Sequence, residues 1–63
     1  MFKFKKYDMV KRIDHPCAWI VMGYEDMQDP KVVYVIRGDH EKPDEGYFLE
    51  SNLELIEEYI PEK

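Results

Sequence analysis

Few residues in this chain could act as a nucleophile or a general base, and they lie far apart. Ser51 is the only serine, there is no threonine, and His15 and His40 lie in different segments. A Ser-His-Asp arrangement would have to bring a histidine to Ser51, in an acidic stretch without a glycine-rich loop for an oxyanion. Cys17, the only cysteine, begins an apolar run, which is more typical of a small buried residue than of a nucleophile. A chain of 63 residues rarely forms an active-site pocket, so we predict that the protein is not an enzyme.

Metal-ligand residue types occur in two short clusters. One is His15 with Cys17, and the other is Asp39-His40-Glu41. Neither has the paired spacing of a structural zinc site, and the second lacks the regular acid spacing of a calcium-binding loop. A single cysteine also excludes an internal disulfide. The sequence therefore predicts no metal, no other cofactor and no evident small-molecule substrate.

Aromatic residues are the most informative set for a binding function. The candidates are Trp19, Tyr24, Tyr34, Tyr47 and Phe48. An aromatic groove can stack bases, enclose a methylated lysine or anchor a protein partner, but so small a chain needs most of its rings in the core. Alternation along the second strand places Ile20, Met22 and Tyr24 on one face and Trp19 and Val21 on the other. If Ile20 and Met22 point inward, Trp19 points outward, where it either anchors an interface or is covered by the terminal segments. We predict that Trp19, Tyr24 and Tyr47 contact a protein partner.

Basic residues offer an alternative function. The candidate phosphate contacts are Lys5, Lys6, Lys11, Arg12 and Arg37. The formal net charge of −5 disfavours non-specific nucleic-acid binding, which needs clustered lysine and arginine. The alternative, a nucleic-acid-binding barrel, requires the basic first strand to converge with Arg37 on one face. Pairing of these side chains with Glu54 and Glu57 would remove it, and such pairing between the two ends is the simpler interpretation.

The elements that must position these residues read as short β-strands. Apolar runs at 18–24 and 31–37, joined by a polar break, predict a β-hairpin with a bulge or bend at Gly23. A first strand within 7–13 places Val10 inward, and a fourth strand at 47–49 follows a polar loop. Both faces of the hairpin are largely apolar. We therefore expect a closed or strongly curled sheet whose outer side is covered by the terminal segments.

The last segment has two interpretations. Glu50-Ser51-Asn52-Leu53 reads as one tight turn followed by a strand at 53–57, but the spacing of Leu55, Glu58 and Tyr59 after Ser51 also suits a helix over 51–59. The strand is preferred, because five strands can close a barrel whereas four would leave edges exposed. The prediction is one domain over 1–63, with a core at about 4–57 and a tail at 58–63.

The apolar spacing of several stretches follows a familiar pattern. The stretches are Tyr7-Asp8-Met9-Val10, Trp19-Ile20-Val21-Met22-Gly23, Tyr34-Val35-Ile36-Arg37-Gly38-Asp39 and Tyr47-Phe48-Leu49-Glu50-Ser51-Asn52-Leu53-Glu54. Together they resemble small SH3-like barrels, a group that includes KOW-type and Tudor-type modules and many short bacterial and phage proteins. The resemblance implies an all-β barrel of about five short antiparallel strands with a short 3-10 turn before the last strand. It implies no ligand, because the fold hosts nucleic-acid, peptide and structural roles. Tyr7 stands where these barrels usually have glycine.

Location and partners complete the prediction. No apolar run approaches the ~20 residues of a membrane-spanning helix, and residues 1–6 lack the apolar core of a signal peptide, so we expect a cytoplasmic protein without membrane contact. The predicted function is a small non-enzymatic binding or accessory module that contacts a protein partner through the hairpin face. A basic partner would suit the acidic surface, and its association would weaken with salt. A second copy is the other partner considered, because a two-fold dimer would bury an uncovered Trp19 face.

Overall fold

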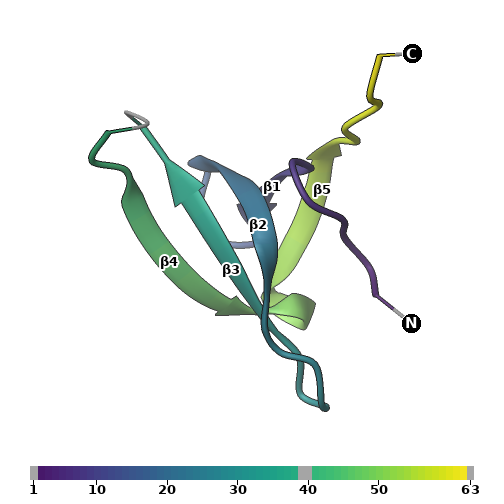
Figure 1. Cartoon of the computed structure of the whole chain (residues 1–63). Helices are drawn as coiled ribbons and strands as arrows, with labels where there is room; N and C mark the ends of the chain where they lie inside the picture. The colour runs from purple at the N-terminus through teal and green to yellow at the C-terminus, as the bar shows by residue number, and fades with distance from the viewer. Residues whose placement is uncertain (1, 39–40, 63) are drawn as a thin grey trace.

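The computed structural model describes residues 2–38 and 41–62, which form one antiparallel sheet of five strands (Figure 1). The elements are β1 (Met9–Arg12), β2 (Ala18–Asp26), β3 (Val32–Arg37), β4 (Asp44–Leu49), the 3-10 turn η1 (Glu50–Asn52) and β5 (Leu53–Glu57). Their order across the sheet is β4-β3-β2-β1-β5. The predicted all-β architecture, with a 3-10 turn before the last strand, is confirmed. Residues 53–57 pair with β1 as a strand, so the alternative helix does not form.

The sheet curls around a small core on its inner face. Figure 1 shows β4 and β5 at opposite edges of this curl. The buried apolar side chains come from the N-terminal segment and from β1, β2, β3 and β5, and they are Phe4, Val10, Val21, Val33, Val35 and Leu53. Burying one such aliphatic side chain contributes about 1.5–3 kcal/mol, so the curl stabilises the fold by covering this one face. Val10 points inward, as predicted.

A bulge at Gly23 reverses the alternation of side chains along β2. Trp19 packs against the core, so its neighbours Ile20 and Met22 lie on the opposite, outer face. The β2–β3 register shifts at Gly23, whose φ of +155° is rare for residues with a side chain. Tyr24 therefore returns to the inner face. The predicted bulge is confirmed. The prediction that Tyr24 shares a face with Ile20 and Met22 is wrong, because the bulge inserts one extra residue into β2 and so moves the side chains that follow it to the opposite face.

One buried carboxylate holds both ends of the chain. Asp8, only 3% exposed, accepts hydrogen bonds from the backbone N–H of Lys5 at 3.0 Å and of Tyr59 at 2.9 Å. The Lys5 ammonium lies 2.9 Å from the same carboxylate. Burial would raise the pKa of Asp8, but these hydrogen bonds and the ammonium outweigh burial and lower it. The N-terminal segment and residues 58–62, which have no regular secondary structure, are thus tied to one point.

A second tie joins the N-terminal segment to η1. The Phe4 N–H donates to the Tyr24 hydroxyl at 3.1 Å, and this hydroxyl donates to the Glu50 carboxylate. The Lys3 N–H also donates to Glu50, at 2.9 Å. Burial and the adjacent Glu50 carboxylate raise the pKa of Tyr24 to about 12. These bonds hold Phe4 over the open side of the curled sheet, where it completes the core.

Candidate functional site

The residues considered for catalysis or metal binding are not assembled into a site. The Cys17 N–H donates to His15 Nδ1 at 3.3 Å, while Ser51 is exposed in η1. Asp39 and His40 lie outside the described residues. Across 2–38 and 41–62, no group of three or more histidine, cysteine, aspartate and glutamate side chains could hold a metal ion. That the protein is neither an enzyme nor a metalloprotein stays a prediction.

Most of the candidate phosphate contacts are paired with acids. The ion pairs have N···O distances of 2.8–3.7 Å and are Lys5–Asp8, Lys5–Glu58, Lys11–Glu54, Arg12–Asp14 and Arg37–Asp44. Lys6 instead lies over the Tyr7 ring, 5.2 Å from its centroid. Lys11 and Arg12 are consecutive in β1 and so point to opposite faces. Arg12 and Arg37 share the inner face, where they lie over the Phe48 and Trp19 rings that pack on each other, but Lys11 points to the opposite face, so the five candidates do not all converge.

Trp19 and Tyr24 face inward, away from Tyr47. The Trp19 ring meets the Phe48 ring edge to face, with centroids 5.4 Å apart, and the Arg37 guanidinium lies 5.1 Å from the Trp19 centroid. Trp19 is therefore half-buried, and the groups packed on it, the Phe48 ring and the Arg37 guanidinium, come from β4 and β3. Tyr47 lies on the outer face and is 54% exposed. The structure does not bring these predicted partner contacts together.

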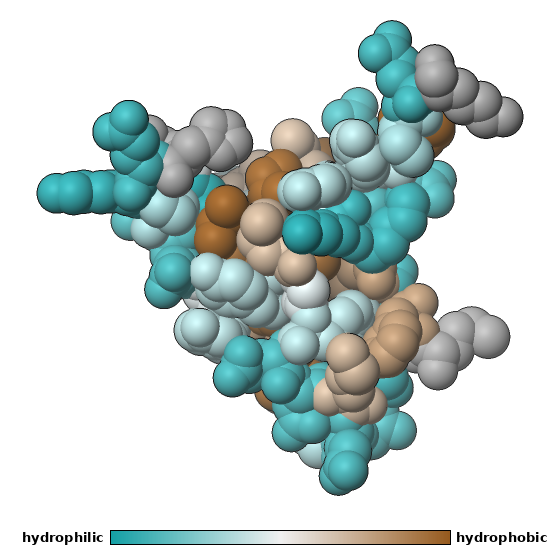
Figure 2. Space-filling model, viewed as in Figure 1, coloured by the Kyte–Doolittle hydropathy of each residue, from teal (hydrophilic) through white to brown (hydrophobic). Residues whose placement is uncertain are grey.

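The outer face of the sheet carries a broad apolar surface. Met9, Ile20 and Ile36 are cross-strand neighbours in β1, β2 and β3, so they form one row across the sheet. Tyr34 and Tyr47 stack beside this row, with ring centroids 5.1 Å apart. Figure 2 shows that apolar surface remains exposed between hydrophilic residues. Such a face is typical of an interaction site.

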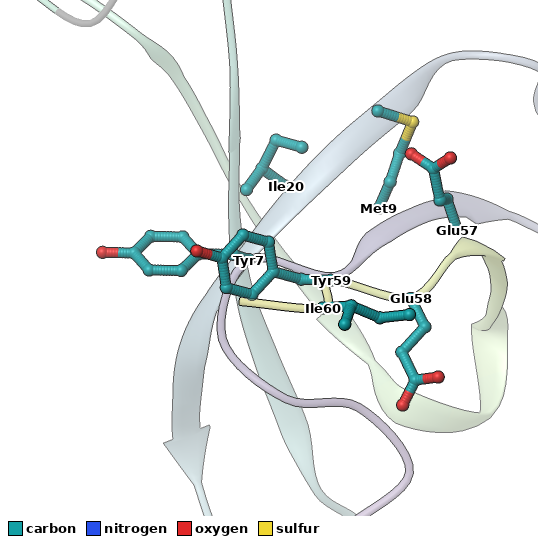
Figure 3. A pocket seen from close by; sticks show the side chains of 7 residues that line it. All are labelled: Tyr7, Met9, Ile20, Glu57, Glu58, Tyr59 and Ile60. Atoms are coloured by element: carbon teal, nitrogen blue, oxygen red, sulfur yellow. The ribbon is translucent and has the colours of Figure 1, made fainter. Parts of the chain in front are cut away.

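Two adjoining hollows make this surface concave. The first, of about 380 Å³, is shown in Figure 3 and is lined by Tyr7, Met9, Ile20, Glu57, Glu58, Tyr59 and Ile60. The second, of about 290 Å³, is lined by Tyr7, Ile20, Met22, Ile36, Arg37 and Gly38. They share Tyr7 and Ile20 and are called here the outer-face groove. Its floor is apolar, one end is acidic through Glu57 and Glu58, and Arg37 lies at the other end.

Tyr7 is the central residue of the outer-face groove and has a strained backbone. Its φ of +76° is the only positive φ of a non-glycine residue within 2–38 and 41–62. The left-handed region costs such a residue about 1–2 kcal/mol. Hydrogen bonds hold this conformation, since the Tyr7 N–H donates to the Val21 carbonyl at 2.7 Å and the Val21 N–H donates to the Asp8 carbonyl at 2.9 Å. The Tyr7 ring packs edge to face on Tyr59, 5.2 Å between centroids, and is 45% exposed.

Sequence reasoning missed Tyr7, Met9, Tyr59 and Ile60 as site residues. The sequence pattern places Tyr59 and Ile60 in the tail, but the hydrogen bond to Asp8 and the ring contact with Tyr7 bring Tyr59 to the sheet. The signal that could have found the groove was the tyrosine at position 7, where SH3-like barrels usually have glycine. Strained residues cluster at functional sites, so a large side chain at a position that favours glycine is a signal for one.

Comparison of the chain with protein-family models, curated proteins and solved structures found no match. The resemblance to SH3-like barrels therefore stays a prediction. In the part of the chain that the structure describes, no helix is long and apolar enough to span a membrane. Since a fold alone does not define a ligand, the function rests on the geometry of the outer-face groove.

Proposed function

We propose that this protein is a small protein-interaction module that binds a partner segment of apolar and basic residues in the outer-face groove. The strained Tyr7 supports this most directly, because its half-exposed ring stands between the two hollows where glycine would fit without strain. Met9 and Ile20 form the apolar floor beneath it. Apolar side chains of a partner would displace water from this floor, which is the main source of affinity.

Charge defines the second half of the partner's chemistry. Glu57 and Glu58 line one end of the groove, with the Glu58 carboxylate paired to Lys5 at 3.2 Å, and the whole chain carries a net charge of −5. A lysine or arginine in the bound segment would pair with the Glu57 carboxylate, whereas an acidic segment or a nucleic acid would be repelled. The association should weaken as salt rises, because the ends of the groove are open to solvent. A cytoplasmic location and a bacterial or phage origin remain part of the proposal.

An amide NMR titration of labelled protein tests this function. The probes are a soluble peptide of alternating leucine and lysine, a peptide with glutamate in place of lysine, and a single-stranded DNA oligonucleotide. We expect the leucine-lysine peptide alone to shift the amides of Tyr7, Ile20 and Tyr59, with smaller shifts at high salt. Equal shifts with either other probe, or shifts confined to another face, would overturn the proposal.

Variants separate binding from stability. Ile20→Ser removes the floor and should weaken binding at least tenfold, while Ile13→Ser, at a 58% exposed position in a turn outside the groove, should leave binding unchanged. Tyr7→Gly should melt within a few degrees of the parent, because relief of about 1–2 kcal/mol of backbone strain offsets the lost ring packing. The same variant should bind the peptide more weakly. Unchanged binding by Tyr7→Gly would show that the ring has no role in the groove.

A further inference from the structure

One edge of the sheet is open at β4. The Glu50 N–H donates to the Lys31 carbonyl at 2.9 Å, which extends the β3–β4 ladder and sets its alternation. In an antiparallel ladder every second residue bonds to the neighbouring strand, so Glu45, Tyr47 and Leu49 direct their N–H and C=O groups away from β3. Nothing in the described part of the chain pairs with this side of β4. The edge therefore presents an unpaired row of donors and acceptors.

The side chains on this edge do not protect it. Tyr47 is 54% and Leu49 38% exposed, and both belong to the outer face with Glu45. Tyr34 stacks on Tyr47, and its hydroxyl donates to Glu45 at 2.9 Å, so the edge is also ordered. Proteins commonly block an edge strand with charged side chains, above all lysine, with proline or with a bulge; β4 contains no lysine, proline or bulge, and its two charged residues, Asp44 and Glu45, lie at its N-terminal end. An ordered, apolar and unblocked edge is suited to pairing with another strand.

We propose that two copies of this chain pair edge to edge through β4, antiparallel, with the two-fold axis at Tyr47. This register aligns the outward-directed backbone groups, because Tyr47 lies opposite Tyr47 of the partner subunit and Glu45 lies opposite Leu49 of the partner subunit. Each of these residues can then exchange both backbone hydrogen bonds. The stacked tyrosines of the two copies become neighbours, and neither glutamate of the edge faces another acid.

Charges on the inner face also permit this register. It places Asp44 opposite Glu50 of the partner subunit, which would be unfavourable if both carboxylates were unpaired. Asp44 already pairs with Arg37 at 3.4 Å, and Glu50 already accepts hydrogen bonds from Tyr24 and from the Lys3 backbone. Asp44 and Glu50, which this register brings face to face, therefore each already have a partner within the monomer. The β4 strand of the second copy also has the same length and twist, because the two copies are identical.

The other edge of the sheet, β5, is less available. The Leu53 N–H donates to the Glu50 carbonyl, and the Leu53 carbonyl accepts a hydrogen bond from the Lys3 ammonium at 3.4 Å. The N-terminal segment also lies beside this strand, since Phe2, Lys3 and Phe4 line a hollow together with Leu55. The dimer is thus placed at β4. This proposal does not depend on the function proposed for the outer-face groove.

Analytical ultracentrifugation from micromolar to millimolar concentration tests the dimer, and charge variants test its register. Leu49→Lys places a lysine opposite Glu45 of the partner subunit twice per dimer. Pairing with this carboxylate outweighs the repulsion by which an edge lysine usually prevents pairing, so the dimer should tighten about fivefold; Leu49→Glu should weaken it by a similar factor. The matched controls are Leu55→Lys and Leu55→Glu, at a 47% exposed position on β5 with the same changes in net charge. The dissociation constants of the Leu55→Lys and Leu55→Glu dimers should differ much less than those of the two Leu49 variants.

Proline supplies an independent test. Tyr47→Pro removes an N–H that bonds to nothing within the monomer, so it should dissociate the dimer without a large change in melting temperature. Circular dichroism confirms that each variant is folded. A protein that stays monomeric at millimolar concentration overturns the proposal. A dimer that responds equally to Leu49→Lys and Leu49→Glu, or survives Tyr47→Pro, overturns the pairing through β4.

Discussion

Replacing Asp8 with alanine should destabilise the protein more than any surface substitution. The Asp8 carboxylate is 3% exposed and is the acceptor for the backbone N–H groups of Lys5 and Tyr59. In Asp8→Ala both donors lose their acceptor, and the two ends of the chain lose their common attachment. The effect should therefore appear in global stability and also in the order of residues 58–60.

The magnitude follows from the hydrogen bonds that are lost. A hydrogen bond to a charged acceptor contributes about 1.5–3 kcal/mol, so the loss of both backbone bonds should lower the free energy of unfolding by about 3 kcal/mol or more. A single core in a chain of this size supplies only ~3–5 kcal/mol in total. The melting temperature should fall by roughly 15 °C. Asp8→Ala is thus expected to be close to unfolded at room temperature.

The Asp8→Asn variant isolates the charge. The pKa of Asp8 is lowered below its ordinary value of 3.8, so the carboxylate stabilises the fold above that pH. This contribution is lost as the pH falls through the lower pKa of the folded state. Asp8→Asn keeps one carbonyl acceptor and the shape of the side chain. Its stability should lie between those of the parent and Asp8→Ala, and it should not show the loss of stability that protonation of Asp8 causes in acid.

Thermal and urea denaturation followed by circular dichroism measure these differences, and amide exchange at Tyr59 reports the local bond. The control is Asp14→Ala, because the Asp14 side chain is 78% exposed and lies 3.7 Å from Arg12. We expect this control to change stability by less than about 1 kcal/mol. If Asp8→Ala melted within a few degrees of the parent, or if the Tyr59 amide kept its protection, the role given to Asp8 would be wrong.

Two further predictions concern packing and alkaline stability. Gly46→Ala should lower the free energy of unfolding by about 1–3 kcal/mol, because the added Cβ would lie 2.7 Å from Phe48 Cε2 and 3.3 Å from Val35 Cγ2; an unchanged urea midpoint would contradict this packing. The raised pKa of Tyr24, about 12 against an ordinary 10.0, stabilises the fold below pH 10, and this stability should be lost as the pH rises towards 12. Tyr24→Phe should remove that dependence and lower the free energy of unfolding by about 1–2 kcal/mol at neutral pH. Urea denaturation of both proteins at neutral and at alkaline pH measures these differences.

Residue patterns predicted five strands, but β4 begins at Asp44 within the expected polar loop, and not every side chain was assigned to its correct face. Alternation of apolar residues located the strands, and Gly23 marked the bulge. A bulge adds one residue whose position in the ladder no local pattern fixes, so Tyr24 was assigned to the wrong face. The orientation of Trp19 stayed open for a related reason, since both faces of β2 are apolar and periodicity cannot choose between them.

The candidate site was harder to predict than the fold. Tyr47 was expected at an interaction surface and lies on the outer face. The groove, however, depends on Tyr7 and Tyr59, which lie outside the strands and have no periodicity. They are positioned by a positive φ and by the hydrogen bond to Asp8, and both are products of the folded structure. In contrast, the pairing of Lys11 with Glu54 followed from simple charge complementarity between the two ends of the chain.

The attachment of both ends to Asp8 also has a consequence for the order of folding. Strands β2, β3 and β4 are joined by short connections and can form early, whereas β1 and β5 meet only after a long loop has closed. Because one carboxylate holds both the segment before β1 and the segment after β5, the two ends should open and close as one cooperative unit. During synthesis, the core therefore stays incomplete until Leu53 and Tyr59 have left the ribosome, and until then the β2–β3 hairpin exposes both of its apolar faces.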